Sequence, residues 1–176
     1  MDAQRNASRS LVEAFTSETP DDFSPVLLAW LDAEITYHWA YNLLVYGQIY
    51  GGRYGIQPDF FDFLYEAPIV QELLGSDSYR QFIMAFMARQ QTKTGKTDNF
   101  WSGQYYLADK LLSGKAQAFF KSELIATAFS TEHFAEMLPL YNSFIQKNQF
   151  KIFDDKVEGL YQKYAPVSPG AVAPAF

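Results

Sequence analysis

One long apolar stretch constrains the fold more than any other feature of this chain. Residues 26–50 are rich in aliphatic and aromatic side chains. Ser24 and Pro25 precede the stretch as a hydroxyl N-cap followed by proline at the first helical position, and Gly51 and Gly52 follow it. The pattern predicts a helix over residues 24–50. Because its apolar residues lie almost all round, we expect a central, buried helix.

The rest of the chain has the same helical periodicity, and no convincing run alternates in the manner of a strand. Caps, prolines and glycines predict shorter helices over residues 8–17, 59–65, 69–74, 76–91, 98–112, 115–129, 130–148 and 153–164. The predicted fold class is therefore all-α. We expect a single-domain bundle of about six to seven helices, packed around the long helix and spanning residues 1–165.

The last residues differ in composition from the rest. Pro166, Pro169, Gly170 and Pro174 lie close together between small residues, and Phe176 ends the sequence. Such a composition predicts an extended tail over residues 166–176. An extended arm of this kind can lie across a neighbouring subunit, so the tail is a candidate partner-binding segment.

The side-chain inventory favours packing over chemistry. Aromatic residues make up 18% of the chain, whereas it has two histidines and no cysteine. The lack of cysteine excludes disulfides, thiolate metal sites and thiol nucleophiles, and it fits a cytoplasmic location. No complete catalytic or cofactor motif is present, so we assign no catalytic residue and expect no cofactor.

The charge balance restricts the partners. The formal net charge of −6 repels phosphate, which disfavours binding to nucleic acid. The stretch over residues 26–50 contains Asp32, Glu34 and His38, and these would be costly inside a bilayer. We therefore expect no transmembrane segment. The first six residues lack an apolar run, so we also expect no secretory signal.

Two clusters could hold a metal. Glu34, His38 and Asn42 are spaced four apart, so they share one stripe of the long helix. Glu132, His133 and Glu136 form the second cluster. Together the two clusters would give a two-histidine, multi-carboxylate site, as in an iron-dependent, oxygenase-like bundle. The Glu-x-x-His step of di-iron bundles is missing, however, and tyrosines could satisfy the first stripe instead.

A third feature is a run of rings that one face of a short helix cannot bury. Phe60, Phe61, Phe63 and Tyr65 lie within six residues, so we expect exposed aromatics that contact a partner. The aromatics of the chain could instead line a pocket for a flat apolar ligand held without a covalent bond.

These features favour a protein that acts through contacts and not through catalysis. We expect a subunit of a larger assembly, or an acidic protein that binds or inhibits a partner protein. The contacts would be made by the aromatic-rich surface and the tail, with self-association as one form of the assembly. The metalloenzyme and the carrier of a flat apolar ligand remain the alternatives.

Overall fold

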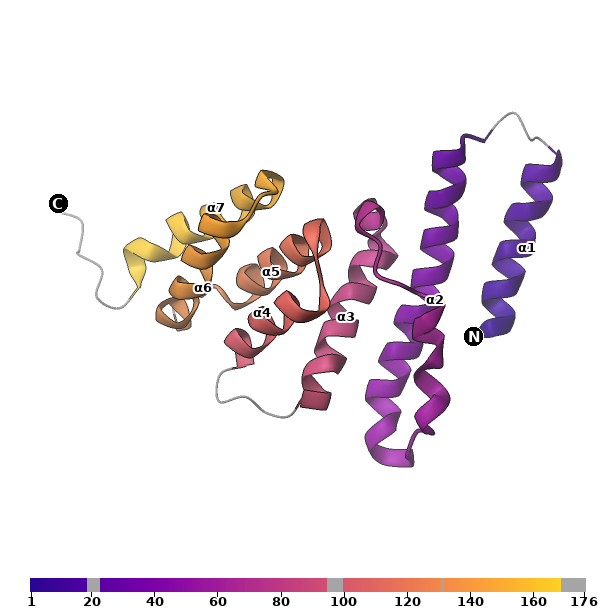
Figure 1. The fold of residues 1–176 in the computed structure, drawn as a ribbon, viewed down its shortest axis with the longest axis horizontal. Helices are drawn as coiled ribbons and strands as arrows, with labels where there is room; N and C mark the ends of the chain where they lie inside the picture. Colours follow the sequence, from indigo (N-terminus) through magenta and orange to yellow (C-terminus); the bar gives the residue numbers. More distant parts are fainter. Residues whose placement is uncertain (19–22, 95–99, 131, 169–176) are drawn as a thin grey trace. The chain divides into compact units, whose positions relative to one another are not determined.

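The computed structural model describes residues 1–18, 23–94, 100–130 and 132–168, and every regular element in these ranges is a helix (Figure 1). The prediction of an all-α fold is confirmed. The chain forms two compact units, Met1–Gln90 and Gln91–Phe176, which we call the first and the second unit and describe separately. The expectation of one domain over residues 1–165 stays a prediction.

The first unit is built on one long helix. Its elements are α1 (Asp2–Glu18), α2 (Pro25–Tyr54), the 3-10 helices η1 (Pro58–Tyr65) and η2 (Gln71–Gly75), and the first part of α3 (Asp77–Thr94). α1 runs antiparallel beside α2, and η1 follows the other end of α2 (Figure 1). α1, η1 and η2 all contact α2, so the long helix is the element on which this unit is assembled.

α2 begins where its caps predict. The hydroxyl of Ser24 accepts a hydrogen bond from the backbone N–H of Leu27 at 3.2 Å, and Pro25 is the first helical residue. The helix continues through Gly51 and ends at Tyr54, and the C-cap residue Gly55 has a φ of 66°, in the left-handed region that favours glycine. The predicted end at residue 50 is therefore four residues short.

The prediction that α2 is a buried helix is correct for its middle and wrong for its two ends. Tyr37, Trp39 and Leu44 in its middle are buried, but Val26 near its start is 79% exposed and Ile49 near its end is 62% exposed. The apolar character of the two ends therefore cannot be explained by burial within the chain.

Most of the rings in η1 pack inward, whereas the sequence predicted that they are exposed. A 3-10 helix has three residues per turn, so Phe60 and Phe63 share one face. Phe63 is buried with its ring edge-on to Trp39, and Phe60 and Phe61 are half-buried. Of the four candidate rings only Tyr65, 89% exposed, stands in solvent.

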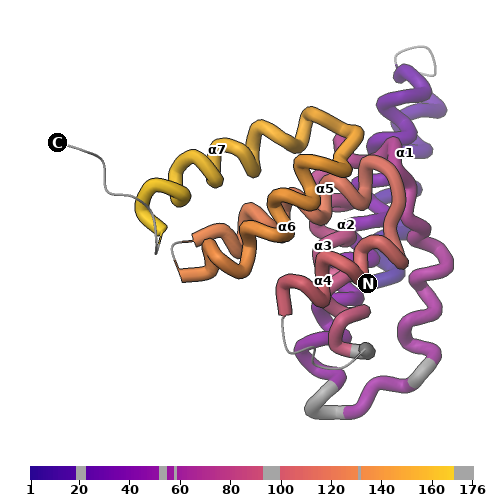
Figure 2. The backbone as a smooth tube through the Cα atoms, turned by 60° about the vertical axis from the view of Figure 1, so that its left-hand side comes forward, coloured from indigo at the N-terminus to yellow at the C-terminus, as the bar shows by residue number. Residues whose placement is uncertain are grey.

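The second unit is built around α5. Its elements are α4 (Phe100–Leu111), α5 (Gly114–Ala128), α6 (Phe134–Lys147), the 3-10 helix η3 (Lys151–Phe153), α7 (Asp154–Tyr164) and the 3-10 turn η4 (Ala165–Val167). α5 contacts α4, α6 and α7, and nine of its 15 residues are buried. Figure 2 shows α7 following α6 at this end of the chain. Parallel rings of Tyr141 and Tyr161, 4.7 Å apart, join these two helices.

The predicted tail is not extended at its start. Residues Ala165–Val167 form one 3-10 turn, which the hydroxyl of Ser168 closes by donating to the carbonyl of Ala165 at 2.9 Å. The fixed φ of Pro166 is compatible with such a turn, which explains why proline does not enforce extended chain here. Pro169 and Phe176 lie outside the described residues, so the arm stays a prediction.

Within the described ranges, no helix combines the length and the hydropathy needed to cross a membrane. The cytoplasmic location and the absence of nucleic-acid binding stay predictions.

Gly47 tests the packing of η1 on α2. A Cβ at this position would lie 2.8 Å from two ring atoms of Phe61, and the guanidinium of Arg89 covers the same ring at 3.0 Å from its centre. We expect Gly47→Ala to lower the free energy of unfolding by about 1–2 kcal/mol, because the displaced ring outweighs the gain in helix propensity. Urea denaturation followed by circular dichroism measures the change.

Gly159→Ala is the matched control, because a Cβ there meets nothing within 4 Å in the helix α7. We expect this variant to be more stable by about 0.5–1 kcal/mol. A Gly47→Ala protein as stable as the Gly159→Ala protein would show that the rings do not pack tightly on α2.

Candidate functional site

The stripe of Glu34, His38 and Asn42 lines a hollow of about 300 Å³ in the first unit, which we call the polar hollow. α1 contributes the opposite wall through Arg5 and Ser8, among others. The prediction that these three α2 residues share one face is confirmed.

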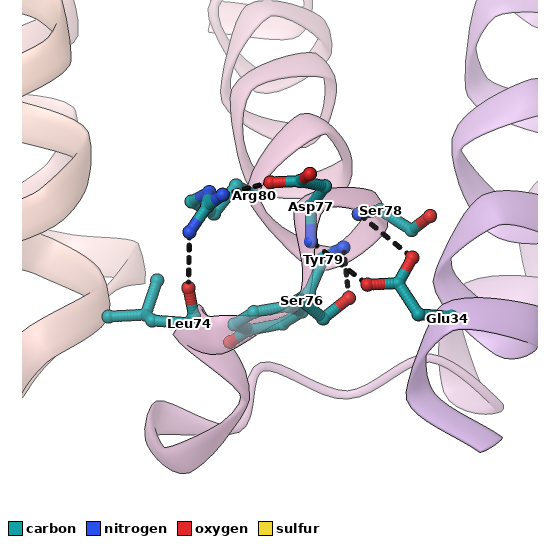
Figure 3. A network of polar contacts seen from close by, with 7 residues as sticks. All are labelled: Glu34, Leu74, Ser76, Asp77, Ser78, Tyr79 and Arg80. Atoms are coloured by element: carbon teal, nitrogen blue, oxygen red, sulfur yellow. Dashed lines mark hydrogen bonds and ion pairs between the residues drawn. The ribbon is translucent and has the colours of Figure 1, made fainter. Parts of the chain in front are cut away.

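Glu34 accepts hydrogen bonds from the start of α3 (Figure 3). Its two carboxylate oxygens accept hydrogen bonds from the backbone N–H groups of Asp77 and Ser78, at 3.0 and 3.4 Å. The hydroxyl of Ser76 accepts from the N–H of Tyr79 at 3.0 Å, as an N-cap does. These contacts satisfy the first three N–H groups of α3, which have no partner inside the helix.

The pKa of Glu34 reflects this role. Burial by itself would raise it, but hydrogen bonds from the hydroxyls of Ser78 and Ser76 and from the backbone N–H groups of Ser78 and Asp77 outweigh burial. The pKa is lowered below its ordinary value, so the carboxylate is ionised at neutral pH. An anion at a helix N-terminus is also favoured by the helix dipole.

Arg5 and Trp39 close one end of the polar hollow. The guanidinium of Arg5 lies 3.8 Å above the centre of the Trp39 ring and forms an ion pair with Glu66 at 2.8 Å. The indole N–H of Trp39 donates to the carboxylate of Asp2 at 2.8 Å. These contacts attach α1 to α2 and to the chain after η1, so both side chains have a structural role.

The second predicted cluster lies in the second unit, before and within the first turn of α6. The His133 Nδ1 lies 3.6 Å from a carboxylate oxygen of Glu136, and both Glu132 and His133 are exposed. An acid in a first helical turn is favoured by the helix dipole without any ligand.

The metal hypothesis finds no support in the part of the chain that the structure describes. No three histidine or acidic side chains there are grouped closely enough to hold a metal ion. Both carboxylate oxygens of Glu34 accept hydrogen bonds from the α3 backbone. Apart from Glu34, the stripe has no carboxylate that could bind a metal together with the solvent-exposed His38. The stripe is thus a helix-joining contact that borders a polar hollow.

The sequence did not lead us to a second hollow, of about 310 Å³, at the other end of the α1–α2 pair. We call it the apolar hollow, because every residue of its lining except Thr16 is apolar; the lining is Leu11, Val12, Phe15, Thr16, Phe23 and Leu31. Leu11 and Phe15 are one turn apart on α1 and are 64% and 61% exposed. None of the residues of α1 is buried, and these two side chains lie at the surface.

One further apolar side chain of α2 extends this surface. Leu27 lies one turn before Leu31 on the same face and is exposed. Together with the apolar hollow it forms what we call the α1–α2 apolar face. Clustered exposed side chains of this kind are typical of interaction sites.

Acidic residues lie close to this face. Glu18 is two turns after Leu11 on the same side of α1, and Asp32 follows Leu31 on α2; both are exposed. Asp32 forms an ion pair with Arg9 at 3.0 Å. The last turn of α1 contains Glu18 and no basic residue, although the helix dipole favours a cation there.

The charges of the chain are also unevenly distributed. Residues 1–90 contain five arginines, no lysine and twelve acidic residues, whereas residues 91–176 contain nine lysines and eight acidic residues. The net negative charge of the protein therefore belongs to the first unit. This count, together with Leu11 and Phe15 spaced four apart, was the available sequence signal for the α1–α2 apolar face.

Comparison with known protein families, with curated proteins and with solved structures found no match to this chain. The function is therefore argued from the geometry.

The capping role of Glu34 predicts a pH-dependent loss of stability in Glu34→Gln. The lowered pKa means that the ionised carboxylate stabilises the fold fully above its ordinary pKa of 4.5. This stabilisation is lost as the pH falls through the folded-state pKa. We expect the variant to unfold about 1 kcal/mol more easily at pH 7 and the difference from the parent to shrink below pH 4.5.

Urea denaturation at a series of pH values measures this difference. Glu13→Gln is the control, because Glu13 is an exposed glutamate in the helix α1 of the same unit. A Glu34→Gln protein with the same pH profile as Glu13→Gln would contradict the cap.

Proposed function

We propose that the first unit is a non-catalytic docking module that binds a basic, amphipathic segment of a partner protein on the α1–α2 apolar face. The observation that carries this proposal is the exposure of Leu11 and Phe15 beside an apolar hollow in a helix that buries none of its residues. Such a groove suits the apolar face of a helix, whose side chains recur every three or four residues.

The basic character of the partner follows from the charges around the face. Glu18 and Asp32 lie close to it, and the unit as a whole carries an excess of seven acidic residues. A cation placed beside Glu18 would also interact favourably with the C-terminal end of α1. Lysine or arginine on the rim of the partner would therefore speed association and favour this partner over acidic ones.

This assignment keeps the expectation of an acidic interaction protein but places the contact elsewhere. Phe60, Phe61 and Phe63 pack inside the first unit, so Tyr65 is the one ring of that run that we retain as a contact. Exposed apolar side chains at α1 and α2 take the place of the others.

A pair of synthetic helical peptides tests the proposal. Both have about 18 residues and the same pattern of leucines, and their polar face is lysine in one and glutamate in the other. Fluorescence anisotropy of the labelled peptides with the full chain measures binding. We expect saturable binding of the lysine peptide, weakened by salt, and none of the glutamate peptide.

The double variant Leu11→Ser/Phe15→Ser removes the apolar anchor and should weaken binding at least about tenfold. Ile152→Ser is the control, because Ile152 is an apolar residue of the second unit that is 80% exposed. Equal binding of both peptides, or no effect of the double variant, would overturn the proposal. Dimerisation of the chain that the double variant abolishes would identify a second copy as the occupant instead and would also overturn it.

A further inference from the structure

The second unit contains a hollow of about 270 Å³ whose described lining includes two lysines and no acidic residue. We call it the basic hollow. It lies among Tyr105 of α4, one face of α5, and the corner between the end of α6 and Phe150. On α5 the lining residues Gly114, Gln117 and Lys121 recur every three or four residues, so they form one stripe.

Lys121 is the most unusual residue of this site. Its side chain is only 10% exposed, although lysine is rarely buried. The ammonium group lies 2.5 Å from a carboxylate oxygen of Asp109 and 4.1 Å from the centre of the Tyr105 ring. An ammonium has three N–H donors, and the ion pair uses one of them.

Lys147 brings a second positive charge to the same hollow. It lies exposed in the last turn of α6. Two carboxylates contact lining residues of the hollow, and both have partners: Asp109 pairs with Lys121, and Asp154 accepts from Lys151 and from Asn148. These carboxylates do not balance the charge of Lys147, so the hollow has a local excess of positive charge within an acidic protein.

The walls are rigid and partly aromatic. The amide of Asn148 donates to the carbonyl of Phe150 at 2.9 Å and accepts from its N–H at 3.1 Å, which fixes the corner after α6. Gln117 donates to the carbonyl of Leu112 at 3.0 Å and so joins α5 to the chain after α4. Chiefly through burial, the pKa of Tyr105 is raised to about 12, so its phenol stays neutral at physiological pH.

We propose that the basic hollow binds a small anion, a carboxylate or a phosphate, that carries one flat ring. Lys121 and Lys147 would contact the anionic group, and the rings of Tyr105 and Phe150 would contact the flat part. The volume limits the ligand to about the size of a single substituted ring. This site lies in the second unit and does not depend on the docking function of the first.

Titrations of the isotope-labelled full chain, followed by nuclear magnetic resonance, test the proposal with four probes: phenyl phosphate, benzoate, inorganic phosphate and benzylamine. We expect saturable shifts around Lys121 and Lys147 with phenyl phosphate or benzoate, and the tighter of the two identifies the anion. Inorganic phosphate should bind at least about fivefold more weakly than phenyl phosphate, because it lacks the ring. Benzylamine should not bind.

Variants separate the site from general charge effects. Lys147→Gln should weaken binding about fivefold or more, and Lys121→Met should abolish it. Lys163→Gln is the matched control, because Lys163 is an exposed lysine in the last turn of α7. Since Lys147 is on the surface, its variant tests the proposal even if Lys121→Met fails to fold.

Three outcomes would overturn the proposal. The first is no saturable shift with either aromatic anion, the second is equal binding of benzylamine, and the third is an equal loss of affinity in Lys147→Gln and Lys163→Gln.

Discussion

The contact between Glu34 and the first N–H groups of α3 joins the long helix α2 to the start of α3. It links residues 43 positions apart and sets where α3 begins relative to α2. The segment between the two helices is then held by tyrosines. Tyr37 donates to the carbonyl of Pro68 at 2.6 Å, and the hydroxyl of Tyr79 accepts from the N–H of Val70 at 2.7 Å. Irregular backbone needs hydrogen-bond partners when it is buried. The two tyrosines supply such partners to the segment between η1 and η2, and this supports the packing of both 3-10 helices against α2.

Local signals predicted the helices well. Ser24 and Pro25 placed the start of α2, and the polar breaks placed α3 to α7 within a few residues, because caps and breaks act on neighbouring residues. Burial was harder to predict, since it depends on the surface opposite. Phe61 is half-buried because α2 presents Gly47 at the point of contact, and nothing in the η1 sequence indicates this.

The candidate site could likewise be predicted where it depends on local spacing, but not where it depends on a distant partner. The spacing of Glu34, His38 and Asn42 correctly placed them on one face, but the partner of Glu34 is a helix terminus that no spacing within α2 could indicate. The apolar stretch over residues 26–50 predicts burial, but its start is exposed. The interaction surface is argued mainly from Leu11 and Phe15 of α1, whose exposure depends on how α1 packs on α2.

The separation of arginine and lysine between the two units affects how the protein reacts with reagents. Residues 1–90 offer twelve carboxylates and no side-chain amine. A carbodiimide couples carboxylates directly to amines. It therefore cannot link side chains of the first unit to one another. Any link from Glu13 or Glu18 to a side-chain amine must use a lysine from outside the first unit. Amine-directed labels, in turn, would modify side chains of the second unit alone.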